Sequence, residues 1–269
     1  MLKDITFGQY YESGSFIHKL DPRMKMILMI AFIVFIFMSG NIISLLFATA
    51  CVLLTAFISG VPFKLYLKNM KAILPVLIFT AVINIFYGDG GKVLLSFWSL
   101  EITTAGLYRS FFMALRILLL IFISSALTYT TTPNDLTDGI ESLLSPLKYI
   151  GLKNAVHTLA MMMTIALRFI PTLIEEAEKI MNAQKARGAD LESGGLIDRV
   201  KALIPILIPL LVSSVRRADE LAKAMECRCY NGGEGKTRMK QMTLKATDFT
   251  ALISVTIMCG IIILFNILF

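Results

Sequence analysis

The chain has 269 residues, of which 56% are hydrophobic and 17% charged, with a mean hydropathy of +0.73 and a net charge of +7. Soluble domains are about half apolar and about a quarter charged, so both departures indicate a membrane protein. The modest positive charge argues against nucleic acid as a partner. In a chain this apolar, it is typical of basic cytoplasmic loops beside a lipid bilayer.

The apolar runs predict about five membrane-spanning helices, because each span needs about twenty mostly apolar residues. The stretch 24–59 is too long for one span and is interrupted at Ser39-Gly40-Asn41, so it predicts two helices joined by a tight turn. Further spans are predicted at about 72–87, 110–130 and 249–269.

Basic residues set the predicted orientation, since cytoplasmic loops carry an excess of Lys and Arg. The N-terminal flank and the loop after the second span are basic, whereas the loop after the third span is not. The basic residues of the first two segments are His18, Lys19, Arg23, Lys25, Lys64, Lys68 and Lys71. This pattern predicts a cytoplasmic N-terminus and an extracellular C-terminus at the cell membrane.

The same reasoning divides the chain into three parts. We expect an N-terminal cytoplasmic segment with four spans in 1–130, a cytoplasmic block in 131–247 and a last span in 248–269.

The cytoplasmic block contains two strongly apolar stretches, 155–167 and 203–215, which are too short to span a bilayer. Pro205 and Pro209 interrupt the second stretch, and the residues beyond each stretch become amphipathic and charged. Such segments lie on a membrane surface or pack across the ends of spans. Three helices are predicted in the block, at about 134–147, 154–187 and 196–229. The expected fold is therefore an all-α integral membrane protein with a block of amphipathic helices.

Two charged helical stretches of this block end on an arginine and form a weak internal repeat. Counting back from Arg187 and Arg228, the matched pairs are Ala177 with Ala218, Glu178 with Asp219, Ile180 with Leu221 and Ala183 with Ala224. A guanidinium is a planar fork that suits carboxylates and carbonyls in a partner's groove. The alternative is that each arginine only complements the carbonyl end of its own helix. The repeat favours the first reading and predicts a partner with two subunits.

The sequence offers no catalytic constellation. It lacks an HExxH motif and a Ser/His/Asp set, and its only histidines are His18 and His157. Cys227 and Cys229 have no nearby histidine or further cysteine to complete a metal site. Gly235-Lys236-Thr237 looks like the end of a phosphate-binding loop, but Tyr230 stands where that motif needs a glycine. We therefore expect no metal, cofactor or nucleotide site, and no enzyme activity.

Two polar residues inside predicted spans need partners. Arg116 is expected to form a structural ion pair, with Glu101 as a possible partner. Asn84 is expected to form a hydrogen bond between helices.

Several short motifs together resemble a known family over nearly the whole chain. The N-terminal part contains Gly8-Gln9-Tyr10, Ser15 and the run from His18 to Lys25, in which Asp21-Pro22 is also a good helix start. Ala186-Arg187-Gly188 and Cys227-Arg228-Cys229 follow in the block. These residues resemble the transmembrane T component of energy-coupling factor (ECF) transporters, a branch of the ABC transporters. In the second arginine motif, Cys229 replaces the usual glycine.

The resemblance implies a non-catalytic coupling scaffold. Two ABC ATPase subunits, expected to be non-identical, would dock on the two arginine motifs, and a substrate-binding membrane subunit (the S component) would pack on the block. ATP-driven motion would then drive uptake of a vitamin or metal ion. The docking residues implied are Ala186, Arg187, Gly188, Cys227, Arg228 and Cys229. The alternative is a self-sufficient secondary transporter or channel, which would carry polar residues and broken helices at mid-membrane.

Overall fold

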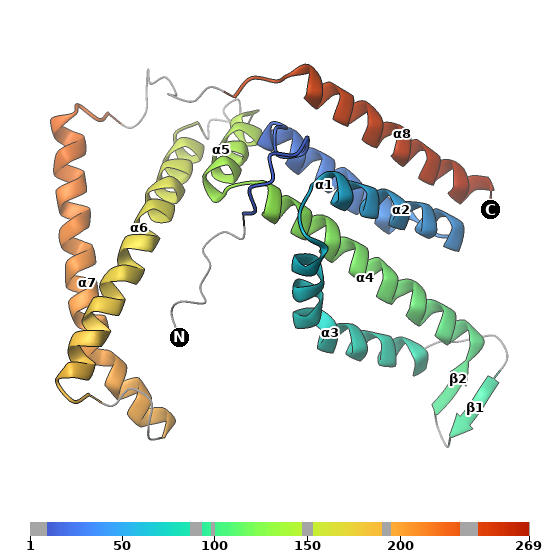
Figure 1. Cartoon of the computed structure of the whole chain (residues 1–269), viewed down its shortest axis with the longest axis horizontal. Coiled ribbons are helices and arrows are strands. Elements are labelled where there is room, and N and C mark those ends of the chain that lie inside the picture. Colours follow the sequence, from blue (N-terminus) through green and yellow to red (C-terminus); the bar gives the residue numbers. More distant parts are fainter. Residues whose placement is uncertain are drawn as a thin grey trace. The chain divides into compact units, whose positions relative to one another are not determined.

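The computed structural model of the chain is built almost entirely of helices, as predicted (Figure 1). It describes residues 10–86, 93–97, 100–146, 153–189, 195–231 and 242–268. The helices are α1 (Pro22–Met38), α2 (Ile42–Ile58), α3 (Phe63–Phe86), α4 (Thr104–Thr130), α5 (Pro133–Leu143), α6 (Lys153–Ala186), α7 (Leu196–Cys227) and α8 (Ala246–Leu268). Two short strands, β1 (Val93–Phe97) and β2 (Leu100–Thr103), lie between α3 and α4.

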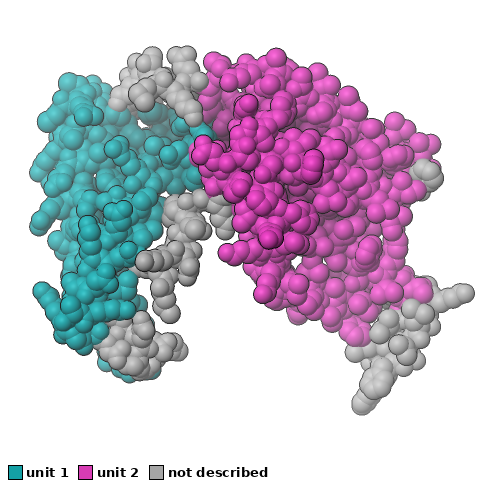
Figure 2. All heavy atoms as spheres, in the orientation of Figure 1, with its two compact units in different colours: residues 1–7, 133–240 teal, residues 8–132, 241–269 magenta. Residues whose placement is uncertain are grey.

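The chain forms two compact units (Figure 2). One unit lies within residues 133–240 and contains α5, α6 and α7. The other comprises Gly8–Thr132 and Gln241–Phe269, and so contains α1 to α4, the two strands and α8.

The predicted break after the first span is confirmed. Asp21 caps α1 by accepting a hydrogen bond from the Arg23 N–H, and Pro22 occupies the first helical position, where its missing N–H costs nothing. The helix ends at Met38, and α2 begins at Ile42 after the turn Ser39-Gly40-Asn41.

The turn between α1 and α2 packs against the last turn of α8. The Gly40 N–H donates to Oδ1 of Asn266 at 3.1 Å, and a Cβ on Gly40 would meet that oxygen at 2.7 Å. A Cβ at this position would therefore displace the Asn266 side chain and its hydrogen bond to residue 40. The Asn266 amide also donates to the Met38 carbonyl at 3.2 Å.

Arg116 anchors the same turn and does not form the expected ion pair in the part of the chain that the structure describes. Its guanidinium donates to the Ser39 carbonyl and lies against the rings of Phe112 and Phe37. The carbonyl and the two aromatic faces stabilise the guanidinium without burying a second charge, and its buried Nε has no hydrogen-bond partner among the described residues. The Glu101 side chain lies outside the described residues.

The core of this unit lies between α1, α2, α4 and α8, with the first half of α3 against α4. Tyr66 stacks on Phe122 with 4.9 Å between ring centroids and meets the edge of Tyr129 at 5.3 Å. The Tyr129 hydroxyl donates to the Leu65 carbonyl. These contacts fix the start of α3 to the end of α4.

Helix α3 bends along its length (Figure 1), and Pro75 lies inside it. Proline lacks an N–H and its ring clashes with the carbonyl four residues earlier, so it kinks a helix interior. Asn84 donates to the Thr80 carbonyl of the same helix at 2.8 Å, so the predicted interhelical bond is wrong. The antiparallel hairpin β1–β2 was not predicted, because its short apolar run carries no clear period.

By length and composition, four of the described helices are apolar enough to cross a membrane: α3, α4, α8 and 155–186 of α6. Helices α1 and α2 have 17 residues each, at the short limit for a span. The prediction that the apolar stretch 155–167 is too short to span a membrane is wrong by this criterion of length and composition. That stretch continues into one helix of 34 residues.

Candidate functional site

Helices α6 and α7 end in the same backbone motif, with an arginine at the same position in each. Arg187 follows the last residue of α6, and the Ala189 N–H donates back to the Gln184 carbonyl at 3.0 Å. Arg228 follows α7, and the Tyr230 N–H donates to the Met225 carbonyl at 3.1 Å. The residue after each arginine donates three residues back, so both ends are Schellman motifs.

The residue after each arginine adopts the left-handed conformation, with φ of 83° at Gly188 and 56° at Cys229. Glycine adopts this conformation without strain, whereas a residue with a Cβ pays about 1 kcal/mol. The sequence left open whether the cysteine would change the exit of α7. The structure gives the two ends the same backbone geometry, and the residues on either side of each arginine differ by the two exposed thiols of Cys227 and Cys229.

We predict that Gly188→Ala destabilises the last turn of α6 and that Cys229→Gly stabilises the last turn of α7. Nothing lies within 4 Å of a Cβ on Gly188, so the cost comes from the backbone angle alone. A change of about 1 kcal/mol alters amide exchange about five-fold. Hydrogen–deuterium exchange measures this, with Gly195→Ala, at φ −69°, as the control. Unchanged exchange in both variants would contradict the left-handed conformation of Gly188 and Cys229.

The two helices run antiparallel and cross at a polar cluster, which we call the crossing cluster: Glu176, Ser213 and Arg217. Arg217 donates to Oε2 of Glu176 at 2.8 Å, and the Ser213 hydroxyl donates to Oε1. Nearer the start of α6, the Tyr230 hydroxyl contacts the Met161 sulfur, which confirms the antiparallel direction (Figure 1). The Ser213 hydroxyl and the Arg217 guanidinium hold the pKa of the Glu176 carboxyl below its ordinary value, so this group is ionised at neutral pH.

The crossing cluster lies at equivalent positions of the sequence repeat. Glu176 precedes Arg187 by the same eleven residues by which Arg217 precedes Arg228. When equivalent positions of two antiparallel helices meet, the helices are related by a local two-fold axis. Each arginine therefore lies about 16 Å from the crossing along its own helix, and the two arginines lie in opposite directions.

Both arginine side chains are exposed, and among the described residues neither guanidinium enters an ion pair with a carboxylate. Ala183 and Ala224, one turn before the arginines on the same helical face, are exposed as well. Each tip thus presents a guanidinium above a small side chain that allows close approach. This geometry suits insertion into a groove on another molecule.

A second feature of this unit is an apolar stripe on the first two-thirds of α7. Its members recur every three or four residues and are 47% to 72% exposed: Ile197, Val200, Leu203, Ile204, Leu207, Ile208, Leu211, Val212 and Val215. Ile206, on the other side of the helix, is buried. A contiguous apolar surface of this kind marks contact with protein or membrane.

The other sequence candidates lie apart from these features. His157 is within 3.4 Å of Glu141, between α6 and α5. Cys227 and Cys229 are exposed, and no group of three or more metal-ligating side chains occurs in the described part of the chain. Gly235-Lys236-Thr237 lies outside the described residues.

Comparison with known proteins identifies the family. A model of the CbiQ family, described as cobalt transport protein, matches residues 13–239. The chain is 51% identical over 265 residues to the energy-coupling factor transporter transmembrane protein EcfT of Clostridium kluyveri, covering 98% of this chain and 97% of that one. The chain belongs to this family. It is also 51% identical over 254 residues to the EcfT protein of Ruminiclostridium cellulolyticum (94% of this chain, 93% of that one) and 41% identical over 262 residues to that of Listeria innocua (97% and 98%).

Membership of the EcfT family confirms the resemblance seen in the sequence. The chain is thus the transmembrane component of an ECF transporter, a membrane protein that works as one subunit of a larger complex. The sequence reasoning missed the crossing cluster, although the repeat contained its signal. Extending the matched pairs by one residue would have placed Glu176 opposite Arg217, two opposite charges at equivalent positions.

Proposed function

We propose that this protein transmits ATP-driven motion of two ATPase subunits to a substrate-binding S component, for uptake of a vitamin or a metal ion. The observation that carries the proposal is the antiparallel pair α6 and α7, which ends in two exposed arginines with the same backbone geometry. Two equivalent tips related by a local two-fold axis fit two related subunits.

Each tip is proposed to dock in a groove on one ATPase. The docking residues are Ala186, Arg187 and Gly188 on α6, and Cys227, Arg228 and Cys229 on α7. The arginine supplies bidentate hydrogen bonds, and the exposed alanine one turn before it lets the partner approach. We propose that the two ATPases are non-identical, because the tips differ at Gly188 and Cys229.

The apolar stripe of α7 is proposed to be the contact surface for the S component. Such a partner is itself very hydrophobic, so a continuous stripe of aliphatic side chains suits it better than a charged surface. A motion that changes the angle between α6 and α7 would move this stripe and tilt the subunit bound to it.

We place the N-terminus and 131–247 in the cytoplasm and the C-terminus outside. Helix α6 is long enough to span, but only its first half is apolar, and Glu175, Glu176 and Glu178 follow. Burying these carboxylates in hydrocarbon would be costly, which supports a position outside the bilayer core. The protein itself is proposed to be non-catalytic, with ATP bound by the other subunits.

Purification in mild detergent tests this proposal. We expect two ATPase chains and a small, very hydrophobic membrane protein to co-purify, and the ligand of that small protein identifies the cargo. Solute transport by the purified protein alone in liposomes would instead support a self-sufficient transporter or channel.

The same purification tests the apolar stripe. Leu211 is 67% exposed, so Leu211→Glu is expected to leave the fold intact and to lower the amount of S component at least ten-fold, because a carboxylate is desolvated at the contact. The ATPases should remain bound. Leu211→Met is the matched control, and normal S-component binding by Leu211→Glu would place the contact elsewhere.

A further inference from the structure

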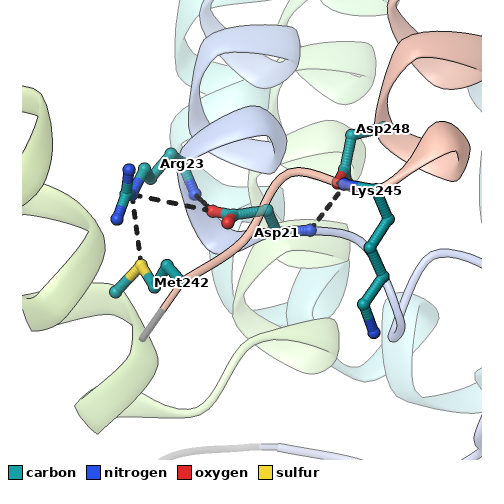
Figure 3. Close-up of polar contacts among 5 residues, drawn as sticks. All are labelled: Asp21, Arg23, Met242, Lys245 and Asp248. Atoms are coloured by element: carbon teal, nitrogen blue, oxygen red, sulfur yellow. Dashed lines mark hydrogen bonds and ion pairs between the residues drawn. The ribbon is translucent and has the colours of Figure 1, made fainter. Parts of the chain in front are cut away.

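In the unit that contains α1 to α4 and α8, a buried carboxylate joins the first helix to the last. Asp248 is 1% exposed and lies in the first turn of α8. Its Oδ1 accepts the Asp21 N–H at 2.8 Å, and its Oδ2 accepts the Lys245 N–H at 2.7 Å (Figure 3). One side chain therefore fixes the start of α1 and the segment before α8.

Arg23 adds a second link at the same place. Its N–H donates to Oδ1 of Asp21 at 2.9 Å, and its Nε contacts the Met242 sulfur at 3.2 Å (Figure 3). Residues 242–248 are thus held against the first turn of α1 at two points, Met242 and Asp248.

A buried lysine joins α1 to the end of α4. Lys25 is 7% exposed, and its Nζ donates to the carbonyl of Thr130, the last residue of α4, at 2.8 Å. The same Nζ donates to the His18 carbonyl at 3.3 Å. A cation is favourable at the carbonyl end of a helix, where the peptide dipoles leave partial negative charge.

These contacts lie at the two places where the chain passes between the units. Residue 130 ends α4, and α5 begins at Pro133. On its return the chain passes through 242–245 and then enters α8, whose first turn contains Asp248. Both connections to the unit that contains α6 and α7 are therefore bonded to the first turn of α1.

We infer that Asp21, Lys25 and Asp248 form a clasp that fixes both connections of the coupling block to the membrane bundle. The clasp lets motion of the block reach the bundle rather than be lost in flexible connections. Buried charges are costly unless they are fully hydrogen-bonded, and apolar residues would hold the helices together as well. The role of fixing two connections in one specific geometry explains why charged residues are used at these three positions. The inference rests on the proposed function and makes these three residues positioning residues.

Lys25→Met tests the clasp, with Lys19→Met as the matched control, because Lys19 is an exposed lysine of the same segment. Both variants are purified as the whole complex and placed in liposomes, and substrate uptake is measured per ATP hydrolysed. For Lys25→Met we expect normal amounts of bound ATPase but about ten-fold less uptake per ATP, since a buried donor to Thr130 is lost. Lys19→Met should behave as the unchanged protein.

Unchanged uptake per ATP in Lys25→Met would overturn the clasp. So would a loss of uptake in proportion to a loss of assembled complex, which would show a role in stability alone. If Lys25→Met fails to insert, the same measurements are made on Asp248→Asn, which keeps the shape of the side chain and one acceptor oxygen. The same two outcomes in this variant would overturn the clasp. The proposed function fails by a different result, namely ATPase binding that persists when Arg187 and Arg228 are reversed in charge.

Discussion

The double charge reversal Arg187→Glu with Arg228→Glu is expected to abolish ATPase attachment and substrate uptake while the protein still inserts. Both side chains are exposed and lie beyond the last turns of their helices, so the change removes no buried contact. An interface arginine that anchors a groove contributes about 2 kcal/mol or more, and a like charge in its place adds repulsion. We expect the loss in bound ATPase to exceed about a hundred-fold.

The controls separate docking from net charge. Arg216→Glu reverses an exposed arginine on α7 that does not lie at a helix end, so it should leave attachment unchanged. Arg187→Lys with Arg228→Lys keeps the charge but loses the planar fork, and should bind more weakly than arginine. Each single reversal should weaken one of two equivalent contacts. Normal uptake by the double variant would overturn the proposed docking sites.

The start of α1 and the ends of α6 and α7 could be predicted because local chemistry determines them. Asp21 and Pro22 mark a helix start whatever surrounds them, and the break at Ser39-Gly40-Asn41 follows from turn-forming residues. The helices of the block were predicted at 154–187 and 196–229 and are found at Lys153–Ala186 and Leu196–Cys227. Strong amphipathic periodicity explains this agreement.

Contacts between distant residues could not be predicted in the same way. Arg116 meets a backbone carbonyl 77 residues away, and no residue-type pattern signals a carbonyl as a partner. Likewise, Asp248 bonds an N–H 227 residues away, near the other end of the chain. For Cys229 the residue type pointed away from the observed structure. A residue with a Cβ rarely adopts the left-handed conformation, but the hydrogen bonds at the end of α7 hold Cys229 in it.

Charge reversal at the crossing cluster is expected to stop transport without removing the docking tips. Glu176→Arg places two guanidiniums opposite each other, where Arg217 now donates to a carboxylate at 2.8 Å, and should lower uptake at least ten-fold. Lys223→Ala is the control, because it breaks the Asp219–Lys223 pair, whose side chains are 59% and 70% exposed. Such surface pairs contribute little, so uptake should stay the same.

The local two-fold axis makes a sharper prediction for the exchanged pair, Glu176→Arg with Arg217→Glu. Equivalent positions exchange their side chains, so the ion pair is restored with its direction reversed. The residue equivalent to Ser213 is Thr172, which also carries a hydroxyl, so Thr172 should donate to the new carboxylate as Ser213 does to Glu176. We therefore expect the exchange to recover most of the uptake, and Thr172→Val to reduce it again only in the exchanged background. Recovery that is equally sensitive to Ser213→Ala would show that the two halves of the crossing are not equivalent.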